Sequence, residues 1–140
     1  MNDNESELQQ YHELCGYSLT HRDPSFLHQH VVDAFAAQRA TASTKPITLI
    51  FALVGLYLHV EKNQTGKQVQ RVHMLLARRR KNWPRFDLPA ATGDVTVADV
   101  MSVPAGPARD AMIDKWCASV WAAYRAYHDQ VVELIQTELA

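Results

Sequence analysis

A run of apolar residues in the first half of the chain constrains the fold more than any other feature. Residues 47–60 form a stretch of 14 positions that is interrupted only by Thr48, Gly55 and His59. A membrane-spanning helix needs roughly 20 apolar residues, so this run is too short to cross a bilayer. A helix that is apolar on nearly all sides is buried by its neighbours. The run therefore predicts a helix at the centre of the protein.

The rest of the chain fits a helical protein without strands. Five glycines and six prolines in 140 residues are few for a protein built of strands and turns. The length suits one domain, which we expect to span residues 1–140. Fourteen basic and fifteen acidic residues leave a net charge of −1, which does not favour a nucleic-acid-binding chain.

Capping residues, prolines and glycines divide the chain into predicted helices. Asp23 and Pro24 resemble an N-cap followed by proline at the first helical position. The expected helices are residues 5–17, 24–41, 46–62 and 66–81, a short turn at 96–100, and a last helix that starts near 107 and runs over roughly 30 residues. Residues 82–95 read as a surface loop. We predict an all-α, single-domain bundle of five to six helices with a long C-terminal helix.

The faces of two helices give further predictions. In the helix expected at 24–41, His28 and Gln38 fall on the apolar side, whereas His30 and Asp33 point away from it. The last helix is apolar over more than half of its circumference. It must therefore pack against two neighbours, or against one neighbour and a second copy of the chain, and we expect a homodimer.

The first residues and the cysteines bear on the compartment. The first fifteen residues carry four acids and no base, unlike a signal or transit peptide. Cys15 and Cys117 form no C-x-x-C pattern and are too few for a disulfide framework. We expect a reduced, cytoplasmic protein that does not enter the membrane.

Four segments resemble those of a bacterial family of small all-helical proteins, a domain family of unknown function. They are VDAFAAQ at 32–38, GLYLHVE at 55–61, TVADV at 96–100 and WCASVW at 116–121. The resemblance covers about residues 12–135, nearly the whole chain. It implies a helical fold and brings no assigned activity.

The seven histidines suggest a divalent-metal or small-ligand site inside the bundle. Neutral imidazoles from several helices suit zinc or iron. The candidate ligands are His28, His59, His73 and His128. Asp33, Gln38 or Glu61 could orient them through hydrogen bonds. No H-E-x-x-H pattern supports this hypothesis, and each histidine could instead be a core residue with one hydrogen-bond partner. Whether the protein is an enzyme stays open.

Two weaker possibilities lie near the N-terminus. His12, Cys15, His21 and His28 are of the right types for a structural zinc, although their spacing matches no standard finger. Cys15 could also be a nucleophile if the nearby histidines lowered its pKa.

The opposing hypothesis is an interaction module without catalysis. From residue 67 to 85 the chain has seven positive residues and no acid. The segment 78–85 contains Arg78, Arg79, Arg80, Lys81 and Trp83. Together with the aromatic face of the last helix, it could bind an acidic protein. Nucleic acid is the less favoured partner because the total charge is near zero.

Overall fold

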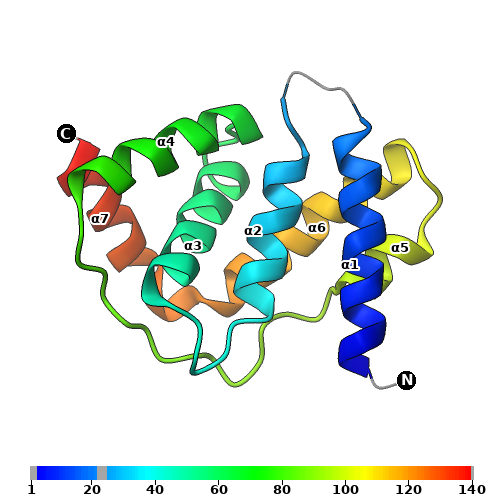
Figure 1. Cartoon of the computed structure of the whole chain (residues 1–140), viewed down its shortest axis with the longest axis horizontal. Coiled ribbons are helices and arrows are strands. Elements are labelled where there is room, and N and C mark those ends of the chain that lie inside the picture. Colours follow the sequence, from blue (N-terminus) through cyan, green and yellow to red (C-terminus); the bar gives the residue numbers. More distant parts are fainter. Residues whose placement is uncertain (1–2, 22–24, 140) are drawn as a thin grey trace.

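The computed structural model describes residues 3–21 and 25–139, and all its regular elements in these ranges are helices, without a strand (Figure 1). Its elements are α1 (Asp3–Leu19), α2 (His28–Gln38), α3 (Pro46–Val60), α4 (Gly66–Arg79), α5 (Val97–Ser102), α6 (Pro107–Ala123), the 3₁₀ turn η1 (Arg125–Tyr127) and α7 (His128–Leu139). The all-α prediction is confirmed, with seven α-helices in the described part of the chain rather than five or six.

The apolar helix lies in the middle of the fold, as predicted. α3 contacts α2, α4, α6 and α7, and these surround it in Figure 1. Leu53 and Val54 have no exposed surface, and every residue from Leu49 to Leu58 except Phe51 is buried. Among the described helices, none combines the length and the apolar character that a membrane span requires.

The prediction for the two faces of α2 was wrong. α2 begins at His28 rather than at residue 24, and the expected Asp23–Pro24 cap lies outside the described residues. His30 and Asp33, expected to point away from the apolar side, are both buried. The reason is that α2 contacts α1, α3, α4 and α6, so its second face is covered as well.

The prediction of a single long C-terminal helix was also wrong. α6 ends at Ala123, a 3₁₀ turn follows, and α7 starts at His128. The buried Tyr124 hydroxyl donates to the carbonyl of Ala37 at 2.6 Å, and His128 Nε2 donates to the carbonyl of Trp121 at 2.7 Å. With this break α6 packs on α2, α3 and α5, while α7 packs on α3 and α4. The wide apolar surface is thus covered by neighbours within the chain.

The segment between α4 and α5 is tied to the helices it crosses. Gln38 of α2 donates to the carbonyl of Val95 at 2.8 Å. The hydroxyl of Ser119 on α6 accepts hydrogen bonds from the amides of Asp94 and Val95. Phe86 is buried and stacks on Tyr127, with ring centroids 4.2 Å apart. The predicted loop is therefore irregular in structure but anchored to the helices near Phe86 and at residues 92–95.

Candidate functional site

The four histidines proposed as metal ligands each have a partner of their own. His28 shares a hydrogen bond with the hydroxyl of Ser18, and His59 with the carboxylate of Asp114. The other two bond to main-chain carbonyls: His73 to that of Phe51, and His128 to that of Trp121. Among the described residues, no group of three or more His, Cys, Asp or Glu side chains could hold a metal ion. The structure does not bring the four histidines together.

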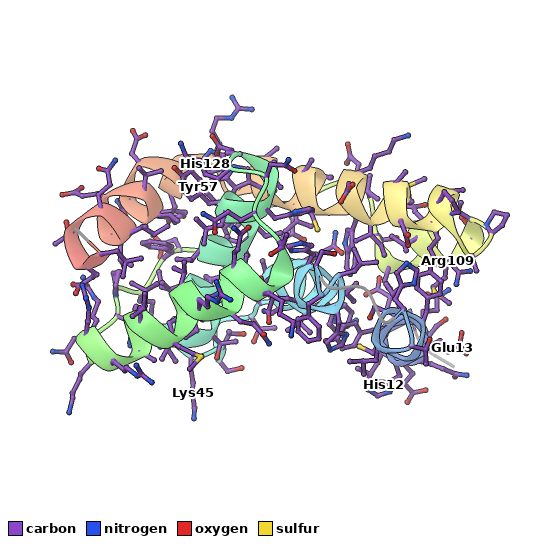
Figure 2. The ribbon with its side chains drawn as sticks, turned by 90° about the horizontal axis from the view of Figure 1, so that it is seen from above. His12, Glu13, Lys45, Tyr57, Arg109 and His128 are labelled. Carbon is purple, nitrogen blue, oxygen red and sulfur yellow. The ribbon has the colours of Figure 1, made fainter. Side chains whose placement is uncertain are left out.

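Gln38 and Glu61, expected to orient metal ligands, instead bind tryptophans. The indole of Trp116 donates to Gln38 Oε1 at 2.8 Å, and the indole of Trp121 donates to the carboxylate of Glu61. His128 stacks on Trp121 with ring centroids 3.7 Å apart, near Tyr57 (Figure 2). Gln38 lies in segment 32–38, Glu61 in segment 55–61, and the two tryptophans in segment 116–121. Their hydrogen bonds connect α2 and the end of α3 to α6. Their contacts explain them as structural residues.

The N-terminal alternatives are not supported by the geometry either. Figure 2 shows His12 on the outer side of α1, away from the other helices, and His21 pairs with Asp110 at 2.9 Å. Burial raises the pKa of the Cys15 thiol, whereas a nucleophile needs a lowered pKa. This shift disfavours the thiolate and gives no support to Cys15 as a nucleophile.

Part of the basic segment is used within the chain. Arg79 donates to the main-chain carbonyl of Glu138, and Arg80 pairs with the Glu138 carboxylate at 3.2 Å. The Arg80 guanidinium also lies 5.7 Å from the ring centre of Trp83. These contacts join the end of α4 to α7. Arg78 and Lys81 are exposed.

The aromatic face of the last helix is not a free surface. Trp116, Trp121 and Tyr124 are buried in the core of the chain. The expectation that they form a partner or dimer surface was wrong, because α6 packs on α2 and α3 and the three side chains bond to Gln38, Glu61 and Ala37.

A cleft between α2, α3 and α4 brings two of the predicted site residues together. Asp33 of α2 and His73 of α4 both line it, and its volume is about 340 Å³. The other lining residues are Gln29, Val32, Ala36, Ile47, Thr48, Phe51 and Ala52. Small-molecule sites are typically clefts of this kind, mainly apolar with a few polar groups.

Asp33 is the most unusual residue of this cleft, because its side chain is ionisable and only 3% of the residue is exposed. Gln29, one helical turn earlier, donates its amide to Asp33 Oδ1 at 3.0 Å. Oδ2 is buried and has no hydrogen-bond partner among the described residues. Burial therefore raises the pKa of this carboxyl well above its ordinary value, and the bond from Gln29 offsets only part of the shift.

Gly55 makes room for this carboxyl. A Cβ atom on Gly55 would overlap Asp33 Oδ2, and it would lie 3.2 Å from a methyl group of Val69. The only glycine of the apolar helix thus stands where α3 meets the Asp33 side chain. No sequence motif pointed directly to this contact, although a glycine inside a strongly apolar helix often marks a close approach.

His73 of α4 also lines the cleft. Its Nε2 donates to the Phe51 carbonyl at 2.7 Å, and its ring stacks on the Phe51 ring with centroids 4.8 Å apart. Burial lowers the pKa of His73, so the imidazole is neutral near pH 7. Because Nε2 carries the hydrogen, Nδ1 is the acceptor nitrogen of this ring.

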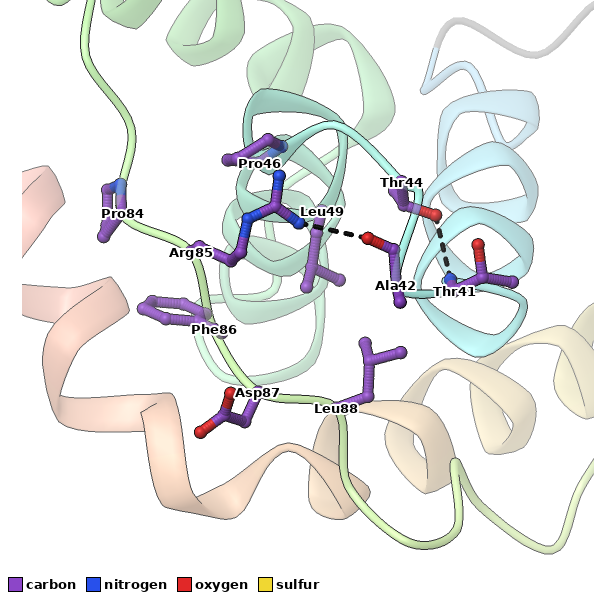
Figure 3. Close-up of a pocket in the computed structure, with 10 residues that line it drawn as sticks. All are labelled: Thr41, Ala42, Thr44, Pro46, Leu49, Pro84, Arg85, Phe86, Asp87 and Leu88. Atoms are coloured by element: carbon purple, nitrogen blue, oxygen red, sulfur yellow. Dashed lines mark hydrogen bonds between the residues drawn. The ribbon is translucent and has the colours of Figure 1, made fainter.

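A second cleft, of about 310 Å³, lies between the α2–α3 connection and residues 84–88 (Figure 3). There Arg85 donates to the carbonyl of Ala42 at 3.3 Å, and the amide of Thr41 donates to Thr44 Oγ1. Its charged lining residues, Arg85 and Asp87, are exposed to solvent. The hydrogen bond from Arg85 ties residues 84–88 to the α2–α3 connection. This cleft lacks a buried ionisable group like Asp33.

The sequence identified Asp33 and His73 as candidates but assigned them to a metal site. Gln29 was missed. Its only signal was the i, i+4 spacing to Asp33 on one helix, which is common on solvent-exposed helix faces as well.

Comparisons with known proteins give a family but no function. A family model described as a family of unknown function, DUF5946, matches residues 8–125. No curated protein and no solved structure matches the chain. The match covers most of the sequence, from α1 into the 3₁₀ turn after α6. The chain belongs to the DUF5946 family, whose function is unknown.

Proposed function

We propose that this protein binds a small organic molecule in the cleft between α2, α3 and α4. One observation carries the proposal: a carboxyl group on the cleft wall is buried, and one of its oxygens has no hydrogen-bond partner among the described residues. Burying an uncompensated polar group costs about 1–3 kcal/mol in proteins, and more for a charged one. Oδ2 itself lies against Gly55 of α3, so a ligand in the cleft would offset this cost through its charge or through a bond to Oδ1, rather than by bonding Oδ2.

The surroundings of Asp33 support a binding role. Strongly perturbed ionisable groups in clefts mark functional sites more often than other positions do. Here the carboxyl lines the same cleft as a neutral imidazole and the apolar side chains of Val32, Ile47 and Phe51. A purely structural carboxyl would be expected to have both oxygens paired, because buried polar groups nearly always are.

A divalent metal such as zinc or iron is the less supported occupant, because the described residues offer no group of three ligands. Asp33 and His73 alone would leave most of the coordination sphere to the ligand or to water. We also propose one domain in the cytoplasm. The two cysteines, which form no disulfide, are consistent with a reducing compartment.

Ligand-observed NMR on the whole chain, with a mixture of small cationic, neutral and anionic organic molecules, tests the proposal. Thr48 is exposed at the edge of the cleft, so Thr48→Trp should fill the space without disturbing the core. We expect signals from bound molecules in the wild type that disappear in Thr48→Trp. Thr137→Trp, the same change at an exposed site of α7, should keep them. Binding that is equal in both variants, or absent throughout, would contradict the proposal.

A second candidate function rests on the outer face of α4. Met74 and Leu75 are 55% and 38% exposed, and they line a shallow groove with Arg71 and Arg78. Exposed apolar side chains between two arginines suit an amphipathic acidic helix of a partner protein. If so, Arg71→Glu/Arg78→Glu should abolish partner capture, whereas Arg79→Glu should act mainly through the lost bond to α7.

A further inference from the structure

We infer that the Asp33 cleft is built for an organic amine in its cationic form, with an apolar body. The inference rests on the function proposed above and names the ligand class of the same site. It is carried by the hydrogen-bonding groups of the cleft wall, by the charges around Asp33 and by the aromatic rings beside it.

The hydrogen-bonding groups of the cleft are mainly acceptors. An ionised Asp33 can only accept hydrogen bonds, and His73 presents Nδ1 as an acceptor because Nε2–H is bound to the Phe51 carbonyl. Gln29 uses its amide nitrogen on Asp33, which leaves Oε1 as a further acceptor beside one N–H. A ligand that meets two or three acceptors must bring several N–H or O–H donors. A protonated amine carries three.

No positive side chain of the cleft balances Asp33. None of its nine lining residues is a lysine or an arginine. The ionisable groups that interact electrostatically with Asp33 from other helices are Tyr11 of α1 and Cys117 of α6. Burial raises the pKa of both, so each is uncharged near pH 7. With His73 neutral as well, a carboxylate here lacks a counter-charge, and a bound cation would supply it.

Aromatic rings give the cleft a surface for the rest of the molecule. Phe51 and His73 line the cleft with their rings stacked on each other, and Trp83, which does not line the cleft, meets the Phe51 ring edge-on with centroids 5.3 Å apart. Aromatic faces attract cations and cover apolar groups. An anion, in contrast, would leave Asp33 in its neutral form and would gain no charge attraction, because none of the lining residues is a lysine or an arginine.

Binding should be coupled to a proton. Without a ligand, burial keeps the pKa of Asp33 raised, which favours the neutral acid. A cation in the cleft stabilises the carboxylate, so the proton leaves to the buffer when the amine binds. Neither an alcohol nor a carboxylate ligand would drive this release.

Isothermal titration calorimetry on the full-length protein can test the class with three probes of similar shape: 2-phenylethylamine, 2-phenylethanol and 3-phenylpropanoate. We expect the amine to bind at least about tenfold more tightly than the alcohol, as for a charge-assisted hydrogen bond, and the carboxylate to bind weakest. The amine's binding enthalpy should differ between phosphate and Tris buffers because a proton is released.

Two variants separate the possible results. Asp33→Asn should remove both the preference for the amine and the buffer dependence while leaving the alcohol bound, whereas Asp87→Asn at an exposed carboxyl should change neither. If the alcohol or the carboxylate binds as tightly as the amine and Thr48→Trp abolishes that binding, small-molecule binding in the cleft is supported, and the proposal of an amine ligand is overturned. If Thr48→Trp removes no binding of any probe, both proposals are overturned.

Discussion

Among single residues, the cleft depends on the carboxyl group of Asp33 and on the absence of a side chain at Gly55. Asp33 Oδ2 is placed against Gly55, so the chain leaves space on α3 for a group that is costly to bury. Both residues lie in segments 32–38 and 55–61, two of the four from which a family resemblance was predicted. Their contact connects α2 to α3 directly behind the cleft.

We predict that Gly55→Ala destabilises the protein although alanine favours helices. The added methyl would overlap Asp33 Oδ2, and overpacking of this kind costs about 1–3 kcal/mol. Gly16→Ala on α1 is the matched control: nothing lies within 4 Å of its new Cβ, so the helix should gain up to about 1 kcal/mol. Urea unfolding of both variants measures the difference. A stabilised Gly55→Ala would show that Asp33 does not pack there.

The raised pKa of Asp33 predicts how stability depends on pH. Because the folded-state pKa lies above the unfolded value, the stability tied to Asp33 is complete below about pH 4 and is lost as pH rises through the folded pKa. Asp33→Asn should therefore gain stability relative to wild type between pH 4 and neutral pH. Chemical denaturation at a series of pH values measures this gain, with Asp87→Asn as the exposed control. Parallel curves for wild type and Asp33→Asn would refute the prediction.

At the scale of helices, local signals predicted some boundaries well and others not at all. Thr65 begins α4 as expected, since its hydroxyl accepts from the Gln68 amide and Gln68 Oε1 accepts from the Thr65 amide. The break after α6 has no such signal, because residues 121–128 contain neither glycine nor proline. Contacts with distant residues cause that break, and a single sequence does not reveal them.

Tyr124 holds this break, and its hydroxyl should matter for stability. Tyr124→Phe would leave the carbonyl of Ala37, near the end of α2, without its partner, at a cost of about 1–2 kcal/mol. Tyr127→Phe is the control. It removes a hydroxyl that accepts from the exposed amide of Asp87, and it should change stability by less than about 0.5 kcal/mol. Thermal unfolding of the two variants decides, and equal losses would argue against this role for Tyr124.

At the scale of the whole molecule, the central position of α3 could be predicted, because a helix of fourteen consecutive, mainly apolar residues is buried by other helices on nearly all sides. The candidate site could be predicted only in part. Asp33 and His73 were singled out by residue type, but they lie 40 positions apart and on different helices. Periodicity places a residue on a face of its own helix. It does not say which helix covers that face, and so Asp33 was expected in solvent.

The central claim is that Asp33 is a buried carboxyl in a cleft that takes a ligand. The most direct measurement is a carbon-detected NMR titration of the Asp33 carboxyl, with and without 2-phenylethylamine. The account predicts a pKa well above the ordinary 3.8 in the protein alone and a lower pKa once the amine is bound. An Asp33 signal that titrates at its ordinary value and does not respond to the amine would contradict it.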